Sequence, residues 1–170
     1  MKRATWLPMG LICLFGMLNY VDRMLLAGTA PLLKHEMALS DTQIGMLSGV
    51  FALIYAGFGV PFGRLADKYP RRWLIAGTVA FWSAMTAAFG LAGSFAGLLI
   101  ARAGVAIGEA GYQPAAYSAI ADLFTPARRN LAFGVFLTTT SVATVLGLSL
   151  GGLLADTYGW RHAFILCGAP

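Results

Sequence analysis

Four ionisable residues lie inside long apolar stretches of this 170-residue sequence: Asp22, Arg23, Arg102 and Glu109. Placing a charge in the hydrocarbon of a membrane costs about 3 kcal/mol or more, so such residues usually face a cavity or a partner of opposite charge. A carboxyl group in that environment can carry a proton, and a guanidinium group can hold an anion. These four residues are therefore the first candidates for a functional site.

The stretch that contains Arg102 and Glu109 has a polar face and a small-residue face. Arg102, Glu109 and Gln113 are separated by seven and four residues, which places them on nearly one line along a helix. Small residues lie on the other side: Gly104, Gly108, Gly111 and Ala115. We therefore expect the polar line to face a cavity and the glycines to pack closely against a neighbouring helix.

Asn19 and Asp22 share a face of the first apolar stretch, and Arg23 points about a quarter turn away. Asp22 and Arg102 come out at similar depth, so we expect them to form an ion pair. Arg23 is expected to snorkel or to brace a loop. Glu109, about 10 Å deeper than Arg102, is then the less compensated carboxylate and the expected proton carrier. Two simpler interpretations stay open: the Asp–Arg pair only locks two helices together, or Glu109 is a neutral, hydrogen-bonded acid of the core.

The elements that must position these residues are membrane-spanning helices. Hydrophobic residues make up 58% of the chain and charged residues 11%, against about 25% charged residues in a soluble domain. Five apolar stretches reach the ~20 residues that one transmembrane helix needs, and a sixth covers less than half of a bilayer. The stretches are residues 5–33, 41–62, 73–93, 95–124, 130–155 and, for the incomplete sixth, 162–170. We expect an all-α, polytopic membrane helix bundle, with residues 1–170 as a truncated N-terminal six-helix domain.

Lysines and arginines are distributed unevenly between the two sets of loops. If the N-terminus is in the cytoplasm, eight of them face the cytoplasm and two face the opposite side. The cytoplasmic set is Lys2, Arg3, Arg64, Lys68, Arg71, Arg72, Arg128 and Arg129, and the opposite set is Lys34 and Arg161. This asymmetry obeys the positive-inside rule and predicts a multi-pass protein with a cytoplasmic N-terminus.

Two similar segments follow the second and the fifth apolar stretch: residues 63–72 and 152–161. Gly, Leu, Ala, Asp, Tyr and Arg match between them at a constant offset of 89 residues. Three helices separate the two copies, so the copies must lie on opposite sides of the membrane. This pattern predicts a three-plus-three inverted repeat.

Other classes of function are poorly supported by the sequence. The net charge of +5 arises from basic residues in short loops between apolar stretches, so we expect no nucleic-acid partner. The sequence contains no nucleotide-binding P-loop and no His-Glu-x-x-His motif. Cys13 and Cys167 lie in apolar stretches without metal-ligand spacing. We expect no enzymatic activity, no catalytic residue, no metal and no cofactor.

Three motifs carry a resemblance to a known family. Gly63, Asp67, Lys68, Arg71 and Arg72 form a pattern that resembles the cytoplasmic loop motif of the major facilitator superfamily, with Pro70 where the family usually has glycine. Asn19-Tyr20-Val21-Asp22-Arg23 is similar to the first-helix signature that spinster-like transporters share with the anion:cation symporter family. Residues 102–118 look more specifically spinster-like, and Gly159-Trp160-Arg161 resembles the entry to helix six.

The resemblance implies that the chain is about half of a twelve-helix secondary transporter. Helices one and four would line the central cavity, and helices two and five would face the missing C-terminal half. The substrate and proton-coupling residues would be Asn19, Asp22, Arg102, Glu109 and Gln113. The loop motif would gate the cytoplasmic side, with Asp67 bound to a helix end or to a basic neighbour.

The function implied is secondary active transport of a small organic or amphipathic solute, coupled to protons, by alternating access. Spinster-like relatives point to lipids or amphiphiles, and the symporter relatives point to organic anions such as sugar acids. The expected partners are the lipid bilayer, a small-molecule substrate and the missing C-terminal half, and the expected location is the bacterial inner membrane. The alternative, from another class, is a truncated membrane fragment that transports nothing and acts only as a packing or interaction module.

Overall fold

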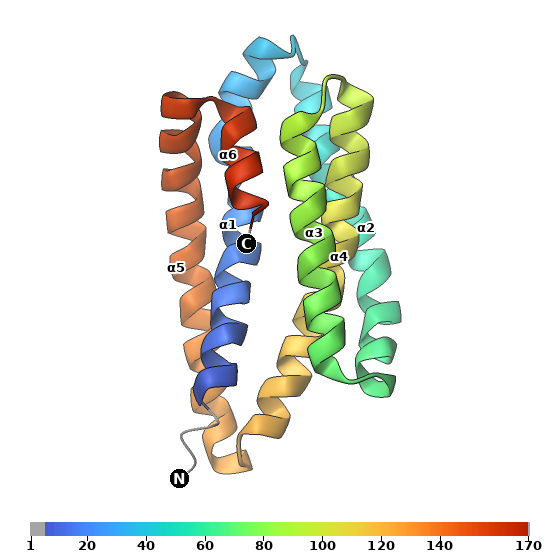
Figure 1. The fold of residues 1–170 in the computed structure, drawn as a ribbon, viewed down its shortest axis with the longest axis vertical. Coiled ribbons are helices and arrows are strands. Elements are labelled where there is room, and N and C mark those ends of the chain that lie inside the picture. Colours follow the sequence, from blue (N-terminus) through green and yellow to red (C-terminus); the bar gives the residue numbers. More distant parts are fainter. Residues whose placement is uncertain (1–5, 170) are drawn as a thin grey trace.

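Every expected stretch forms a helix in the computed structural model, which describes residues 6–169 (Figure 1). The helices are α1 (Trp6–Glu36), α2 (Asp41–Lys68), α3 (Arg71–Leu91), α4 (Phe95–Leu123), α5 (Pro126–Tyr158) and α6 (Trp160–Cys167). The described residues contain no strand. Helices α1 to α5 are each long and apolar enough to cross a membrane. The expected all-α bundle, with five full spans and the start of a sixth, is confirmed.

The helix ends differ from the expected ends at two main points. Helix α2 continues six residues beyond position 62, to Lys68, and α5 begins at Pro126, four residues before position 130. Polar side chains in both extensions interrupt the apolar pattern, but most of these residue types are good helix formers. Ser40 and Gln43 form the expected capping box at the start of α2. Pro126 occupies the first turn of α5, where a missing N–H costs nothing.

The first three helices and the last three are arranged as inverted repeats. Helix α1 packs along α5 and α2 packs along α4, and these two pairs are equivalent when the repeats are exchanged. Figure 1 shows the α2–α3 turn at the end of the bundle where α1 begins and the α5–α6 turn at the opposite end. The two similar segments therefore lie at opposite ends, which confirms the expected inversion.

Basic residues gather at the end of the bundle where α1 begins, which we call the N-terminal end. Six of the eight expected on the cytoplasmic side lie there: Arg64, Lys68, Arg71, Arg72, Arg128 and Arg129. Lys2 and Arg3, together with Thr5 at the expected start of the first helix, lie outside the described residues. Lys34 and Arg161 lie at the opposite end.

Glycines set the spacing at two of the helix contacts. A Cβ atom on Gly108 would lie 2.7 Å from the Cβ of Trp82, so α4 approaches α3 closely at this level. A Cβ atom on Gly147 would lie 2.8 Å from the Cα of Val21, so α5 lies directly on α1. The small-residue face of α4 thus packs against α3, as expected from the sequence. Its polar line is left to face α1 and α2.

Candidate functional site

Asp22, Arg23, Arg102 and Glu109, which we call the charged cluster, come from α1 and α4 near the middle of the bundle. Arg23 is the eighteenth of the 31 residues of α1, and Glu109 is the fifteenth of the 29 residues of α4. Glu109, Asp22 and Arg102 are buried, with exposed fractions of 0%, 3% and 4%. Asp22, Arg23 and Arg102 are all near enough to Glu109 for their charges to act on it.

Glu109 forms an ion pair with Arg23. The Nε atom of Arg23 donates to Oε2 of Glu109 at 2.6 Å, and the Arg23 side chain is 18% exposed. The expectation that Arg23 snorkels or braces a loop is therefore wrong. Glu109 was expected to be the less compensated carboxylate. Among residues 6–169 it is instead the carboxylate of the charged cluster that forms an ion pair. Arg23 reaches it because the quarter turn between Asp22 and Arg23 directs Arg23 toward the polar line of α4.

Asp22 is held by a neutral group instead of by Arg102. The hydroxyl of Thr86 on α3 donates to Oδ2 of Asp22 at 2.5 Å. Among residues 6–169 no ion pair joins Asp22 to Arg102, so the expected pair is wrong in this structure. Thr86 was missed because a single threonine in an apolar stretch reads as core. The available signal was its spacing along α3, which places it on the same face as other buried residues.

Arg102 is a buried cation without an ion-pair partner in the described part of the chain. Its guanidinium carbon lies 4.4 Å from the ring centroid of Phe51, and its Nε has no hydrogen-bond partner. Arg102 lines a cavity of about 290 Å³ together with Arg23, Ser48 and Phe51. A guanidinium group with free donors beside a cavity can hold a carboxylate, sulfonate or phosphate group.

Aromatic side chains of α1 and α2 surround Arg23. Its guanidinium carbon lies 4.3 Å from the ring centroid of Tyr55, 5.2 Å from that of Phe51 and 5.3 Å from that of Tyr20. Each distance is within the ~6 Å at which a ring face attracts a cation. The sequence did not reveal this arrangement, because Phe51 and Tyr55 lie in an apolar stretch where aromatic residues usually serve packing.

Gln113 extends the polar line of α4 beyond the charged cluster. The hydroxyl of Tyr55 donates to Oε1 of Gln113, and Nε2 of Gln113 donates to the hydroxyl of Tyr117 at 3.1 Å. Asn19, the fifth expected site residue, is 3% exposed, and its Nδ2 has no hydrogen-bond partner in the described chain. Free polar atoms also remain on Asp22 (Oδ1) and Glu109 (Oε1). Buried groups left in this state are unusual, and they are suited to bind a proton, water or solute.

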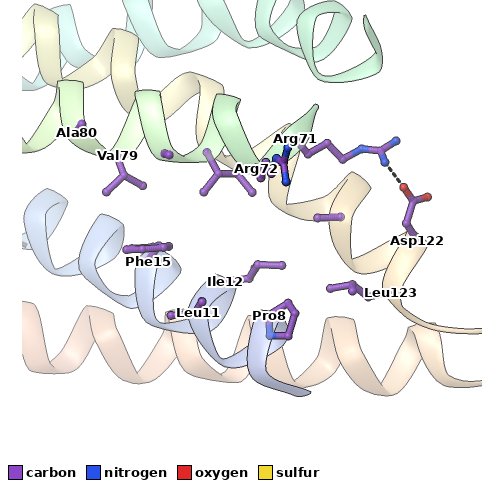
Figure 2. Close-up of a pocket in the computed structure, with 13 residues that line it drawn as sticks. Pro8, Leu11, Ile12, Phe15, Arg71, Arg72, Val79, Ala80, Asp122 and Leu123 are labelled. Carbon is purple, nitrogen blue, oxygen red and sulfur yellow. Dashed lines mark hydrogen bonds and ion pairs between the residues drawn. The ribbon is translucent and has the colours of Figure 1, made fainter. Parts of the chain in front are cut away.

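A second, larger cavity lies away from the charged cluster, at the N-terminal end (Figure 2). It measures about 830 Å³ and is lined mainly by apolar side chains of α1, α3 and α4. Figure 2 shows Pro8, Ile12 and Phe15 on its α1 side and Val79 on its α3 side. This cavity offers apolar surface and a charged rim, but it lacks the buried acids and free guanidinium of the charged cluster.

The loop motif lies at the rim of this large cavity. Arg71 forms an ion pair with Asp122 on α4, which Figure 2 shows as a dashed line. Asp67 is exposed and makes no hydrogen bond or ion pair within residues 6–169. The expectation that Asp67 binds a helix end or a basic neighbour is therefore not met. Arg71 turns toward α4 because α4 brings an acid, Asp122, to the same end of the bundle.

Comparison with known proteins places these features in context. The family model of the Major Facilitator Superfamily matches residues 12–170. An MFS-type efflux pump of Mycolicibacterium smegmatis is 41% identical over 168 residues, which are 98% of this chain and 39% of the pump. Human protein spinster homolog 1 is 34% identical over 158 residues, which are 92% of this chain and 30% of that protein.

A solved structure has the same fold along the whole chain. It is the crystal structure of a bacterial homolog of the human lysosomal transporter spinster, in an inward-facing and occupied conformation. The TM-score is 0.94 at 34% sequence identity, and the match covers all of this chain and 42% of the other. The chain thus spans about two-fifths or less of the length of these relatives.

Proposed function

Because this chain belongs to the Major Facilitator Superfamily, we propose that it is the N-terminal half of a twelve-helix secondary active transporter. The transporter moves a small organic or amphipathic solute by alternating access, and it couples this movement to protons. The share of the relatives that the chain covers supports a second half. Helices α2 and α5 also expose apolar side chains such as Leu53 and Val145. The C-terminal half covers these faces in our proposal.

The observation that carries the proposal is the buried ion pair between Arg23 and Glu109. A proton on Glu109 removes one charge of the pair and leaves Arg23 without an anionic partner. Breaking a buried pair in this way is worth about 3–5 kcal/mol, which is enough to change the preferred conformation of a bundle. Glu109 is the proton carrier in this scheme, and Asp22, which accepts a hydrogen bond from Thr86, is a second group able to take a proton.

The solute in this proposal carries an anionic group. Arg102 faces a cavity and lacks a carboxylate partner, which supports a ligand that supplies one. An organic acid and an amphiphile with an acidic head group share this chemistry. The cavity of about 290 Å³ lies at the lower limit for ligand sites, about 300–1,000 Å³, so we propose that the C-terminal half supplies the other wall.

The loop motif is proposed to gate the N-terminal end. Arg71 links α3 to α4 through Asp122, which supports a rigid frame at this end. Gly63, Lys68 and Arg72 complete the expected motif, and exposed Asp67 is free to contact the C-terminal half. The gate opens when that contact breaks.

The protein is a multi-pass integral membrane protein, and we propose the bacterial inner membrane as its location. The bacterial relatives support this choice. The N-terminal end of the bundle holds six described basic residues near helix ends, and the opposite end holds Lys34 and Arg161. This distribution supports a cytoplasmic N-terminus.

A flux assay tests the proposed function. The full-length transporter is reconstituted in vesicles that contain a pH-sensitive dye, and a sugar acid or an alkyl phosphate is added outside. We expect one of the two anions to cause a saturable proton flux, and we expect an imposed pH gradient to drive its uptake. Proton flux that no added anion changes, or uptake that ignores the gradient, contradicts the proposal. A protein that binds neither anion and moves no protons fits the alternative of a non-transporting module.

A further inference from the structure

Tyr55 connects two parts of the site that lie on different helices. Its ring is the aromatic face closest to the guanidinium of Arg23, at 4.3 Å. Its hydroxyl donates to Oε1 of Gln113 on α4. The ring of Tyr55 thus contacts Arg23, which pairs with Glu109. Its hydroxyl contacts Gln113, four residues after Glu109 on α4.

Glu109, Gln113 and Tyr117 follow one another at intervals of four residues and therefore share a face of α4. Glu109 binds Arg23, Arg23 lies on Tyr55, Tyr55 binds Gln113, and Gln113 binds Tyr117. This series of contacts leads from Glu109 on α4 through α1 and α2 and returns to α4 at Gln113. Tyr117 is 37% exposed, so the series of contacts ends at an accessible side chain.

We propose that Tyr55 is a positioning residue that couples the hydrogen bonding of Gln113 to the protonation of Glu109. The role of this coupling in transport rests on the proposed function, but the coupling itself is a property of the present chain. While Tyr55 is bound to Gln113, its ring stays in place and holds Arg23 against Glu109. When Gln113 takes another partner, Tyr55 and Arg23 are free to move, and Glu109 accepts a proton more readily.

This coupling gives a solute a way to control the proton. A solute that donates a hydrogen bond to Oε1 of Gln113 displaces the hydroxyl of Tyr55. The ring then no longer fixes Arg23, and the ion pair between Arg23 and Glu109 weakens. Binding of the solute and uptake of the proton therefore favour each other, as linkage between two sites requires.

Other groups near Glu109 act in parallel with Tyr55. The charges that reach Glu109 within the described chain are those of Arg23 and Asp22 on α1 and of Arg102 on α4. On α3, the neutral hydroxyl of Thr86 binds Asp22. None of these groups contacts Gln113 through a hydrogen bond in residues 6–169. Tyr55 is the side chain that contacts both Gln113 and the ion-pair partner of Glu109 among these groups.

Infrared spectroscopy of the full-length protein in lipid nanodiscs tests the coupling without any transport assay. The carbonyl stretch of a protonated buried carboxyl group is followed as pH changes, and Glu109→Gln identifies the band of Glu109. Tyr55→Phe keeps the ring and removes the hydroxyl, and Gln113→Leu removes the acceptor. We expect each to move the titration midpoint of the Glu109 band upward by about 0.5–1 pH unit, a three- to tenfold change in proton affinity.

The double variant separates coupling from two unrelated effects. If Tyr55 and Gln113 act through one bond, combining Tyr55→Phe with Gln113→Leu moves the midpoint no further than either change alone. Tyr158→Phe is the matched control, because Tyr158 is exposed and lies at the end of the bundle opposite the N-terminal end. This change should leave the midpoint unchanged. Size-exclusion chromatography and circular dichroism verify that each variant is folded.

The outcomes distinguish this inference from the proposed function. A Glu109 band that titrates, but whose midpoint stays unchanged or falls in Tyr55→Phe and Gln113→Leu, overturns the coupling and leaves Glu109 as carrier. Two shifts that add in the double variant also overturn it. A Glu109 band that does not titrate at all overturns both the coupling and the choice of Glu109 as carrier.

Discussion

Replacing Glu109 by glutamine removes the charge and the titration of the buried acid while keeping its shape. In the structure Nε of Arg23 lies 2.6 Å from Oε2 of Glu109, and the Glu109 side chain is fully buried. Breaking a buried ion pair costs about 3–5 kcal/mol. The glutamine oxygen still accepts a hydrogen bond from the guanidinium, which retains about 1.5–3 kcal/mol. We therefore expect a net loss of about 1–3 kcal/mol in the stability of the bundle.

We expect Glu109→Gln to change transport more strongly than it changes stability. Without a group that takes up the proton, Glu109→Gln should abolish the pH dependence of uptake. Solute binding should be retained, because Glu109 does not line the cavity beside Arg102. The assay measures initial uptake rates in proteoliposomes across a range of external pH, and equilibrium binding in detergent at one pH.

A matched variant controls for the loss of a carboxylate elsewhere. Glu36 binds Arg161 at 3.1 Å at the opposite end of the bundle, where its side chain is half exposed. Glu36→Gln should keep the pH dependence of uptake, since exposed ion pairs contribute only about 0–1 kcal/mol. Unaltered pH dependence in Glu109→Gln refutes Glu109 as the carrier, although it leaves the family assignment intact.

Three further predictions concern other parts of the proposal. Arg102→Gln should weaken binding of an anionic solute about tenfold or more, because a hydrogen bond to a charged group contributes about 1.5–3 kcal/mol; equal affinity in an equilibrium binding assay contradicts this role. Asp67→Asn should slow turnover of the full-length transporter and leave expression largely intact, while Asp156→Asn, at the equivalent position of the second repeat, should not slow it; equal turnover in Asp67→Asn and the unchanged protein removes the gating role. The 170-residue chain alone should show no saturable, gradient-driven uptake in vesicles and should tend to associate, as cross-linking can test; such uptake by this chain alone refutes the need for a second half.

The helices and their inverted arrangement were predictable because their signals are local. An apolar stretch of membrane length fixes one helix, and the matching segments at residues 63–72 and 152–161 fix the relation between the repeats. The face of α4 was predictable for the same reason, since spacing along one helix decides which residues lie on one line.

Pairing between helices was not predictable from spacing along one helix. Asp22 and Arg23 are neighbours, and a rotation of α1 by about 100° decides which of them meets the polar line of α4. The contact of Gly147 with Val21, which belongs to the packing of α1 on α5, is one of the contacts that fix this rotation. Tyr55 was missed for a related reason: its role depends on partners from two other helices, Arg23 and Gln113.

The glycine contact between α1 and α5 also determines which parts of the bundle can move as one body. Gly147 lies directly against Val21, and Gly28 lies against the backbone of α5 near Leu148, so these two helices pack backbone to backbone at two levels. Contacts between α1 and α4 rely more on side chains such as Arg23 and Glu109. If the bundle divides, it should divide between the α1–α5 unit and the α2–α4 unit. The ion pair of the charged cluster would then hold the two units together, and protonation of Glu109 would release them.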